Sequence, residues 1–242
     1  SLFYLLLINK KFIQLLSKFN FNLDISSFNS FIHSNNITVT TVNDSLDSLN
    51  GDLTIETDIT STSGNDLTLI ASDQLVSEND ADISLTGNLN LTAGPGGIQT
   101  IGNIDIGTNT LTSNSGGSAI FVGDVTAGNL SLTTTETGSI IQSTKFKGGE
   151  LNLVTNDGEA VITATSGDLS IGSINLGSGT ATIEASSGVI NDAATDSTID
   201  FVSNSVTLVG TSIGNTQPIE FGTVATLDLT ASSGSISSNS AA

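Results

Sequence analysis

A short pattern of alternating apolar residues, followed by a corner rich in glycine and serine, recurs along the chain. The clearest copies read LNLTAGPGGI from Leu89, ATIEASSGVI from Ala181 and LDLTASSGSI from Leu227. Apolar residues two apart lie on one face of a strand, so each copy predicts a half-buried strand, a tight corner and a second inward residue. These second inward residues are Ile98, Ile190 and Ile236. In-frame copies of this kind predict a repeat architecture.

Weaker copies lie between the clear ones and set the period. The leading residues of all copies are Leu67, Leu89, Leu111, Leu130, Leu151, Leu169, Ala181, Val206 and Leu227. They span 160 residues in eight steps, a mean of 20, with single steps of 12 to 25. The register is least regular between Leu169 and Val206. Strands of three to six residues and corners of Gly, Asn, Asp and Ser predict a coil, and each circuit of it is called a rung.

We therefore predict an all-β fold, a parallel β-helix of about 9–10 rungs stacked roughly 4.8 Å apart into a rod about 45 Å long. It covers residues 51–242. Inward Leu, Ile, Val and Ala would form a narrow apolar core, with Thr, Ser and Asn ladders outside. An antiparallel sandwich also has many short strands, but it has no reason to repeat one motif in frame.

Charge and composition limit the partners. The chain carries 24 acidic residues against five basic ones, a net charge of −19, and has no cysteine. An acidic surface repels phosphate backbones, so nucleic acid is not an expected partner. The lack of cysteine removes disulfides, thiol nucleophiles and cysteine zinc sites.

Residues 1–50 differ in composition and form a separate atypical segment. Apolar residues fall near helical spacing over residues 2–19, which predicts an amphipathic helix that caps the coil. Alternatively, this stretch is an extension that is not native to the fold. The single histidine, His33, is expected at the surface or in packing. Alternation typical of β-structure begins near Ile37.

The pattern Gly-x-Leu-x-Leu-Thr-Ala-x-x-Gly-x-Ile at residues 87–98 resembles the repeats of filamentous haemagglutinin-type exoproteins and autotransporter passengers of Gram-negative bacteria. The resemblance covers about residues 51–242. It implies a right-handed β-helix, secreted or on the cell surface, that acts in adhesion or as a stalk. It also implies receptors or glycans on other cells as partners, and export through an outer-membrane β-barrel transporter. The family's secretion domain carries Asn-Pro motifs, whereas Pro95 follows Gly and Pro218 follows Gln.

A β-helix polysaccharide lyase or hydrolase is the alternative function. It would need paired carboxylates with a cation to hold an acidic sugar. The candidates are Asp80 with Asp82, Asp157 with Glu159, Asp192 with Asp196 and Asp200, and the cations Lys145 and Lys147. Corner positions favour solvated carboxylates, so we assign no catalytic or cofactor-binding residues and predict that the chain is not an enzyme. An enzyme would show three or more acids and a lysine converging within about 10 Å, whereas an adhesin would show no deep pocket.

Metal binding is also not predicted. The calcium-binding nonapeptide of β-rolls, Gly-Gly-x-Gly-x-Asp-x-apolar-x, does not occur in this sequence. Asn79, Asp80 and Asp82 offer oxygen atoms at one corner, but Ca²⁺ takes six to eight oxygen ligands and this corner does not supply them. The sequence therefore assigns no metal ligands.

Overall fold

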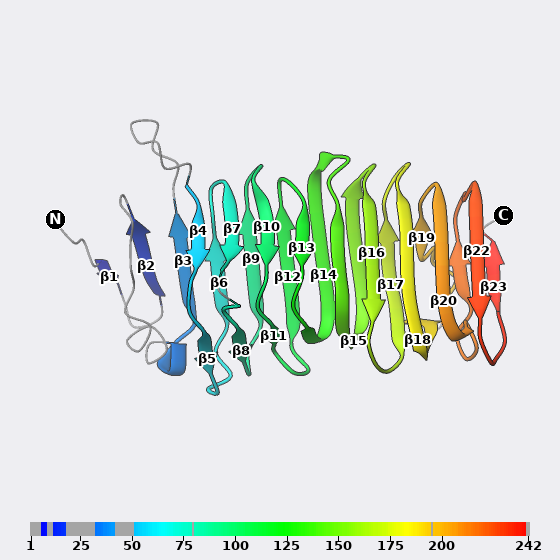
Figure 1. The fold of residues 1–242 in the computed structure, drawn as a ribbon, viewed down its shortest axis with the longest axis horizontal. Helices are drawn as coiled ribbons and strands as arrows, with labels where there is room; N and C mark the ends of the chain where they lie inside the picture. The colour runs from blue at the N-terminus through cyan, green and yellow to red at the C-terminus, as the bar shows by residue number, and fades with distance from the viewer. Residues whose placement is uncertain are drawn as a thin grey trace.

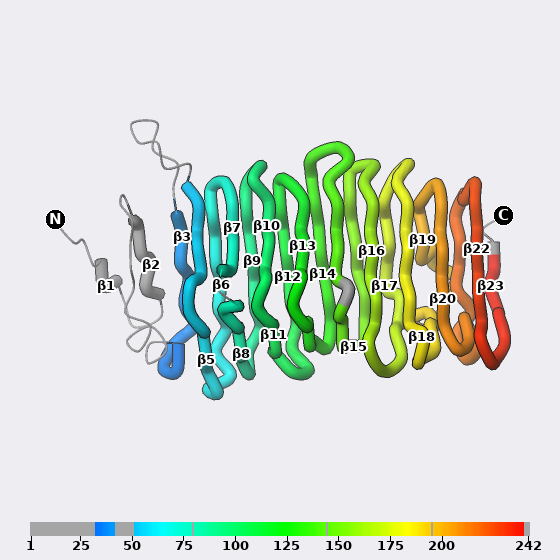
Figure 2. Tube along the Cα trace, viewed as in Figure 1, coloured from blue at the N-terminus to red at the C-terminus, as the bar shows by residue number. Residues whose placement is uncertain are grey.

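Parallel pairing between residues one rung apart builds most of the described part of the chain (Figure 1). The computed structural model describes residues 6–8, 12–17, 32–41, 51–78, 80–194 and 196–240. Its pairs are all parallel except the antiparallel pair of β1 (Leu6–Ile8) with β2 (Phe12–Ser17). Figure 2 shows the rungs stacked side by side along the long axis. The predicted parallel β-solenoid is confirmed, and the antiparallel sandwich is excluded.

The rungs as far as residue 156 have three strand positions, called face 1, face 2 and face 3, and the later rungs continue faces 1 and 2. Face 1 is built from β3 (Ile37–Thr41), β6 (Leu67–Ile70), β9 (Leu89–Ala93), β12 (Thr110–Ser115) and the later parts of β14 (Val125–Thr137) and β15 (Ile141–Asn156). It continues through β17 (Leu169–Asn175), β19 (Phe201–Val202), β21 (Ile219–Phe221) and β23 (Ser238–Ser240).

Face 2 contains β4 (Leu53–Ile55), β7 (Gln74–Ser77), β10 (Gly97–Thr100), β13 (Ala119–Phe121), the start of β15, β16 (Glu159–Ala164), β18 (Thr180–Asp192), β20 (Ser205–Ile213) and β22 (Thr226–Ala231). Face 3 contains β5 (Ile59–Ser61), β8 (Ile83–Leu85), β11 (Ile104–Asp105) and parts of β14 and β15.

Stacked columns of aliphatic side chains form the core. On face 2 one column has nine members: Leu53, Leu75, Ile98, Ala119, Ile141, Ala160, Ala181, Val206 and Leu227. The solenoid therefore has about nine rungs. Burial alternates along each strand, as in β9, where Leu89 and Leu91 are fully buried and Asn90 between them is not. This alternation follows from the strand period of two.

The three clear sequence copies do not share one column, which corrects the predicted register. Leu89 stacks on face 1 with Leu67 and Leu111, whereas Ala181 and Leu227 stack on face 2. The reason is that every face uses the same apolar alternation, so a strand–corner–strand motif fits more than one corner of a rung. The second inward residues of the three copies also lie in different columns. Ile98 belongs to face 2, while Ile190 and Ile236 both stack against Ile213.

Some strands are longer than predicted. β14 and β18 have 13 residues each and β15 has 16, because these strands turn a corner without losing their pairing.

Ile98 and Ile190 are buried, but Ile236 in the last described rung is 45% exposed.

The N-terminal segment differs from its prediction. Strands β1 and β2 lie where a helix over residues 2–19 was expected, and the other residues of that range lie outside the described ones. β2 pairs in parallel with β3, so the backbone edge of β3 overrides the helical spacing of the apolar residues. Helical structure in the described residues is confined to one short turn at residues 32–34, where His33 is exposed. No helix among the described residues is long and apolar enough to cross a membrane.

Close stacking explains a glycine column at the corner between faces 2 and 3. A Cβ on Gly123 would overlap the carbonyl oxygen of Gly102, and a Cβ on Gly102 would overlap that of Ala81. Any side chain at Gly102 or Gly123 would therefore force the rungs apart.

Among the described residues, four buried hydroxyl groups in the core have no hydrogen-bond partner, those of Thr100, Ser113, Thr134 and Ser143. Thr100 is 1% exposed and pairs with Phe121 of the next rung. An unpaired buried hydroxyl is destabilising, and valine has nearly the same shape as threonine. We expect Thr100→Val to raise the free energy of unfolding by about 1 kcal/mol in urea denaturation. Thr112→Val, at an outward position, is the control, and a loss of stability in Thr100→Val would contradict the assignment.

Candidate functional site

The widest rung of face 2 contains an excursion between β18 and β19. From Ala181 to Val206 the column advances 25 residues, compared with 21 in the steps before and after it, from Ala160 and to Leu227. The extra residues lie between Asp192, where β18 ends, and Phe201, where β19 begins. Described residues of this segment line a pocket.

Three carboxylates meet at the base of this excursion. Asp192, Asp200 and Glu220 are 3%, 3% and 6% exposed, and one oxygen from each lies within 4.8 Å of the others. Cross-rung register explains the arrangement. Asp192 occupies an inward position because it stacks on Ile171. Asp200 and Glu220 each precede a phenylalanine, Phe201 and Phe221, whose rings stack 5.3 Å apart.

Backbone groups and one amide hold the cluster in place. The Glu220 backbone N–H donates to Asp200 Oδ2 at 2.8 Å, and the Asp200 N–H donates to the Glu220 carbonyl at 2.9 Å. The Ala194 N–H donates to Asp192 Oδ1 at 3.0 Å. Asn239 Nδ2 donates to Glu220 Oε1 at 2.9 Å, whereas Glu220 Oε2 is buried without a partner. One carboxylate oxygen of the cluster therefore lacks a hydrogen-bond donor.

Burial raises the pKa of Asp200 to about 7, from an ordinary value of 3.8. The hydrogen bond from the Glu220 N–H opposes this shift, and the negative charges of Asp192 and Glu220 add to it. Desolvation and like charges both disfavour the ionised carboxylate. Asp200 therefore takes up a proton near neutral pH in the absence of a compensating cation.

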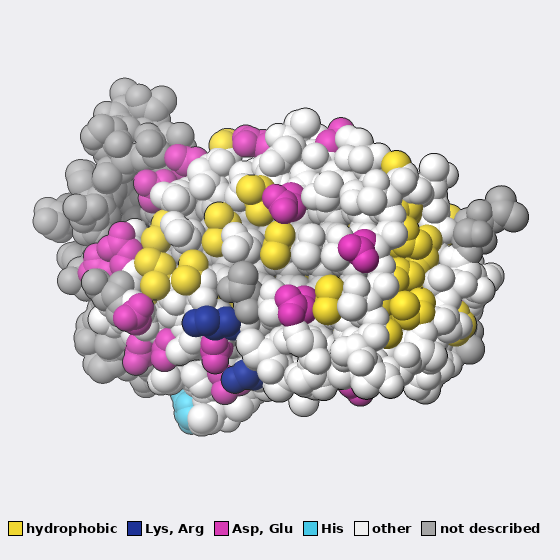
Figure 3. Space-filling view, turned by 45° about the vertical axis from the view of Figure 1, so that its right-hand side comes forward, with side chains coloured by type: hydrophobic (Ala, Val, Ile, Leu, Met, Phe, Trp, Pro, Cys, Tyr) yellow, Lys and Arg dark blue, Asp and Glu magenta, His cyan; other side chains and the backbone are white. Residues whose placement is uncertain are grey.

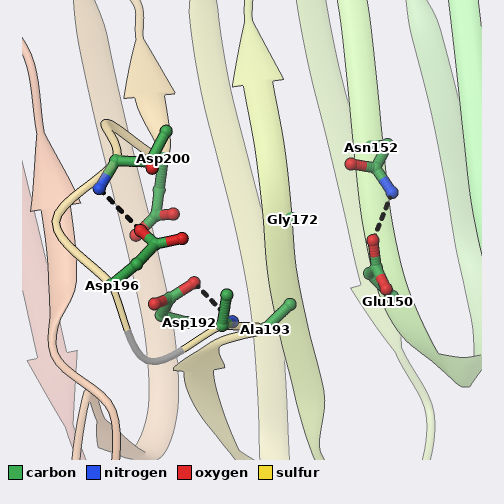
Figure 4. Close-up of a pocket in the computed structure, with 9 residues that line it drawn as sticks. Glu150, Asn152, Gly172, Asp192, Ala193, Asp196 and Asp200 are labelled. Carbon is green, nitrogen blue, oxygen red and sulfur yellow. Dashed lines mark hydrogen bonds between the residues drawn. The ribbon is translucent and has the colours of Figure 1, made fainter.

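A pocket of about 290 Å³ opens onto the cluster. Figure 4 shows Asp192, Asp196 and Asp200 on one side of it and Glu150 with Asn152 on the other. The remaining lining residues are Gly172, Ala193, Ala194 and Thr198. Gly172 lies at the register shift between β15 and β17, and a Cβ there would crowd the Glu150 and Asn152 side chains. A pocket with four acidic side chains was not expected for an adhesin.

The remaining acids lie where the sequence predicted. Asp80, Asp157, Glu159 and Asp196 are exposed and Asp82 is partly exposed, as expected for corner carboxylates, while Asn79 lies outside the described residues. The prediction of solvated side chains was wrong for Asp192 and Asp200. Both side chains are buried because of the way neighbouring rungs pair, as in the pairing of Asp192 with Ile171. The local sequence pattern does not reveal this pairing.

Corner acids have a structural role in an outward ladder. Asp58 Oδ1 accepts the N–H of Asp82, Asp82 Oδ1 accepts that of Asn103, and Asn103 Oδ1 accepts that of Asp124. Asp157 Oδ1 similarly accepts the Ser178 N–H at 2.7 Å, and this hydrogen bond lowers the pKa of Asp157. These carboxylates join successive rungs through backbone hydrogen bonds.

The two described lysines extend the ladder. Lys147 Nζ lies 3.4 Å from Asp124 Oδ2, and Lys145 Nζ lies 4.0 Å from Asp124 Oδ1. Figure 3 shows the lysines beside acidic side chains on the outer surface. Neither lysine lines the pocket, so the convergence of acids with a lysine that an enzyme would show does not occur there.

Sequence reasoning did not single out Glu220. A signal was present: Ile199-Asp200-Phe201 and Ile219-Glu220-Phe221 repeat an apolar-acid-Phe triplet at a spacing of 20. This spacing equals the mean spacing of the sequence copies, and the two phenylalanines that follow the acids pair in neighbouring rungs.

The cluster offers hard oxygen ligands in a buried setting, which suits a divalent cation, and the raised pKa of Asp200 suits a proton donor. Comparisons of the chain with protein-family models, curated proteins and solved structures found no significant match. The fold is a parallel β-solenoid with an acidic pocket.

Proposed function

We propose that this chain is a rod-like structural or adhesive segment of a bacterial exoprotein that is secreted or exposed at the cell surface. The observation that carries the proposal is a polar outward column along face 1, on a continuous stack of about nine rungs. Its members are Thr38, Thr68, Asn90, Thr112, Ser131 and Asn152.

Two physical features support a rod that binds or spaces surfaces. Each rung hydrogen-bonds only to its neighbours over a shared apolar core, so the solenoid resists bending and its length grows with the number of rungs. The hydroxyl and amide groups of face 1 are evenly spaced donors and acceptors, which suit the hydroxyl-rich surface of a glycan. The resemblance of the repeats to haemagglutinin-type exoproteins points the same way, and it implies export through an outer-membrane β-barrel transporter.

The test is attachment of beads coated with the full chain to glycan arrays and cell monolayers. We expect saturable attachment that soluble full chain competes away. A double variant of face 1, Thr68→Lys with Thr112→Lys, should lose at least tenfold in attachment. The matched control, Thr182→Lys with Thr207→Lys, changes two outward threonines of face 2. Attachment that is absent, or equal in both variants, would refute adhesion through face 1.

The alternative, a polysaccharide lyase or hydrolase, is favoured by one observation. The pocket gathers four acidic side chains, and burial raises the pKa of Asp200 to about 7, which suits a general acid. Incubation with acidic and neutral polysaccharides, followed by assays for reducing ends and unsaturated products, tests this function. Product formation by the wild-type chain and its loss in Asp200→Asn would establish the enzyme and displace the structural proposal.

A further inference from the structure

We propose that Asp192, Asp200 and Glu220 form a binding site for one Ca²⁺ ion. The three side chains come from the end of β18, the residue before β19 and the middle of β21. They are almost fully buried, and their oxygens lie within 4.8 Å of one another. This inference goes beyond the proposed function and does not depend on it.

The independent sign of a ligand is Glu220 Oε2. Glu220 is 6% exposed, and Oε2 has no hydrogen-bond partner, although Oε1 of the same carboxylate accepts from Asn239. Buried carboxylate oxygens are otherwise paired with donors or cations because their desolvation is costly. The described ion pairs are those of Lys145 and Lys147 with Asp124, so neither lysine neutralises the cluster. A cation would supply the partner that Oε2 lacks.

The spacing and ligand type favour calcium over smaller divalent ions. Ca²⁺ binds oxygen at about 2.3–2.6 Å, so two of its ligands can lie up to about 5 Å apart. Mg²⁺ requires near-octahedral contacts at about 2.0–2.1 Å, which limits its ligands to separations of about 4.2 Å. Three carboxylates provide three to six oxygens, and the adjoining pocket admits water to complete the coordination.

A bound ion would join two consecutive rungs at their least regular point. Asp200 and Glu220 stack one rung apart, and Asp192 lies where the excursion begins, at the end of β18. The ion would therefore fasten the excursion to the solenoid wall. Because it binds only the folded state, it would raise the melting temperature in proportion to its occupancy.

The test is calorimetric titration of the metal-free full chain with CaCl₂, together with thermal melts in EDTA and in CaCl₂. We expect one site and a melting temperature raised by about 5–10 °C at 100 times Kd. MgCl₂ should bind at least tenfold more weakly. Glu220→Gln should weaken Ca²⁺ binding at least tenfold and remove the calcium-dependent shift.

The change in melting temperature of Glu220→Gln in EDTA shows whether the variant has lost a metal ligand or has lost its fold. Without metal, Glu220→Gln should melt at or above the wild-type temperature. Glutamine has nearly the same shape as glutamate, and the substitution removes a buried charge. Asp196→Asn changes an exposed acid of the same pocket and should keep both binding and shift. Binding that is weak, spread over many sites and equal in wild type and Glu220→Gln would overturn the proposal. So would loss of binding in Asp196→Asn alone.

Discussion

Ile183→Asp should abolish cooperative folding of the full chain. Ile183 is fully buried and stacks between Ile162 and Leu208 in an inward column of face 2. An unpaired carboxylate there is surrounded by aliphatic side chains, so we expect a cost of about 5 kcal/mol or more. Circular dichroism in a urea series would show loss of the β-sheet signal at low denaturant.

The neighbouring residue provides the matched control for this experiment. Thr182 precedes Ile183 on the same strand and points outward, so Thr182→Asp should cost no more than about 1 kcal/mol. The difference in free energy of unfolding between the two variants measures how differently inward and outward side chains of β18 tolerate a charge. Equal losses of stability would show that β18 does not present opposite faces to core and solvent.

The metal-free protein should lose stability as the pH rises from about 4 to 7. Asp200 has a folded-state pKa of about 7 and an unfolded value of 3.8, so in this interval the folded state binds more protons. Its stabilising contribution is complete below pH 4 and is lost by pH 7. A shift of about three pKa units corresponds to at most about 4 kcal/mol. Urea denaturation in EDTA at several pH values measures this dependence.

Substitution isolates the contribution of Asp200 from that of the overall negative charge. Asp200→Asn keeps the shape and can still accept the Glu220 N–H, but it cannot ionise beside Asp192 and Glu220. The fall in stability between pH 4 and 7 should be much smaller in Asp200→Asn than in the wild type. Asp196→Asn, an exposed residue of the same loop, should retain the wild-type slope. If the slopes of wild type and Asp200→Asn coincide, Asp200 is not protonated at neutral pH.

The sequence predicted the fold because a solenoid repeats one local pattern. Leu-x-Leu alternation and Gly, Asn and Ser corners at a mean spacing of 20 residues identified stacked rungs, and about nine are present. Strand period and corner chemistry are local properties that single residues reveal. The same local pattern did not assign strands to faces, since all three faces share it. This is why the copies that begin at Leu89 and Ala181 look alike in sequence although they lie on different faces.

The acidic pocket needed the tertiary structure. Most acids were correctly placed at exposed corners, because Asp and Asn there accept backbone hydrogen bonds from the next rung. Asp192, Asp200 and Glu220 carry the same residue types but are buried together. Their environment depends on the register shift at Gly172 and on the four extra residues of one rung, which change which side chains stack.

By itself, then, the sequence determined the parallel solenoid, its period and its apolar core, since these follow from spacing along the chain. The tertiary structure alone decided which column each strand joins, where β2 pairs, and which three carboxylates meet. These outcomes depend on contacts between residues a full rung apart, and an irregular rung changes those contacts without changing the local pattern.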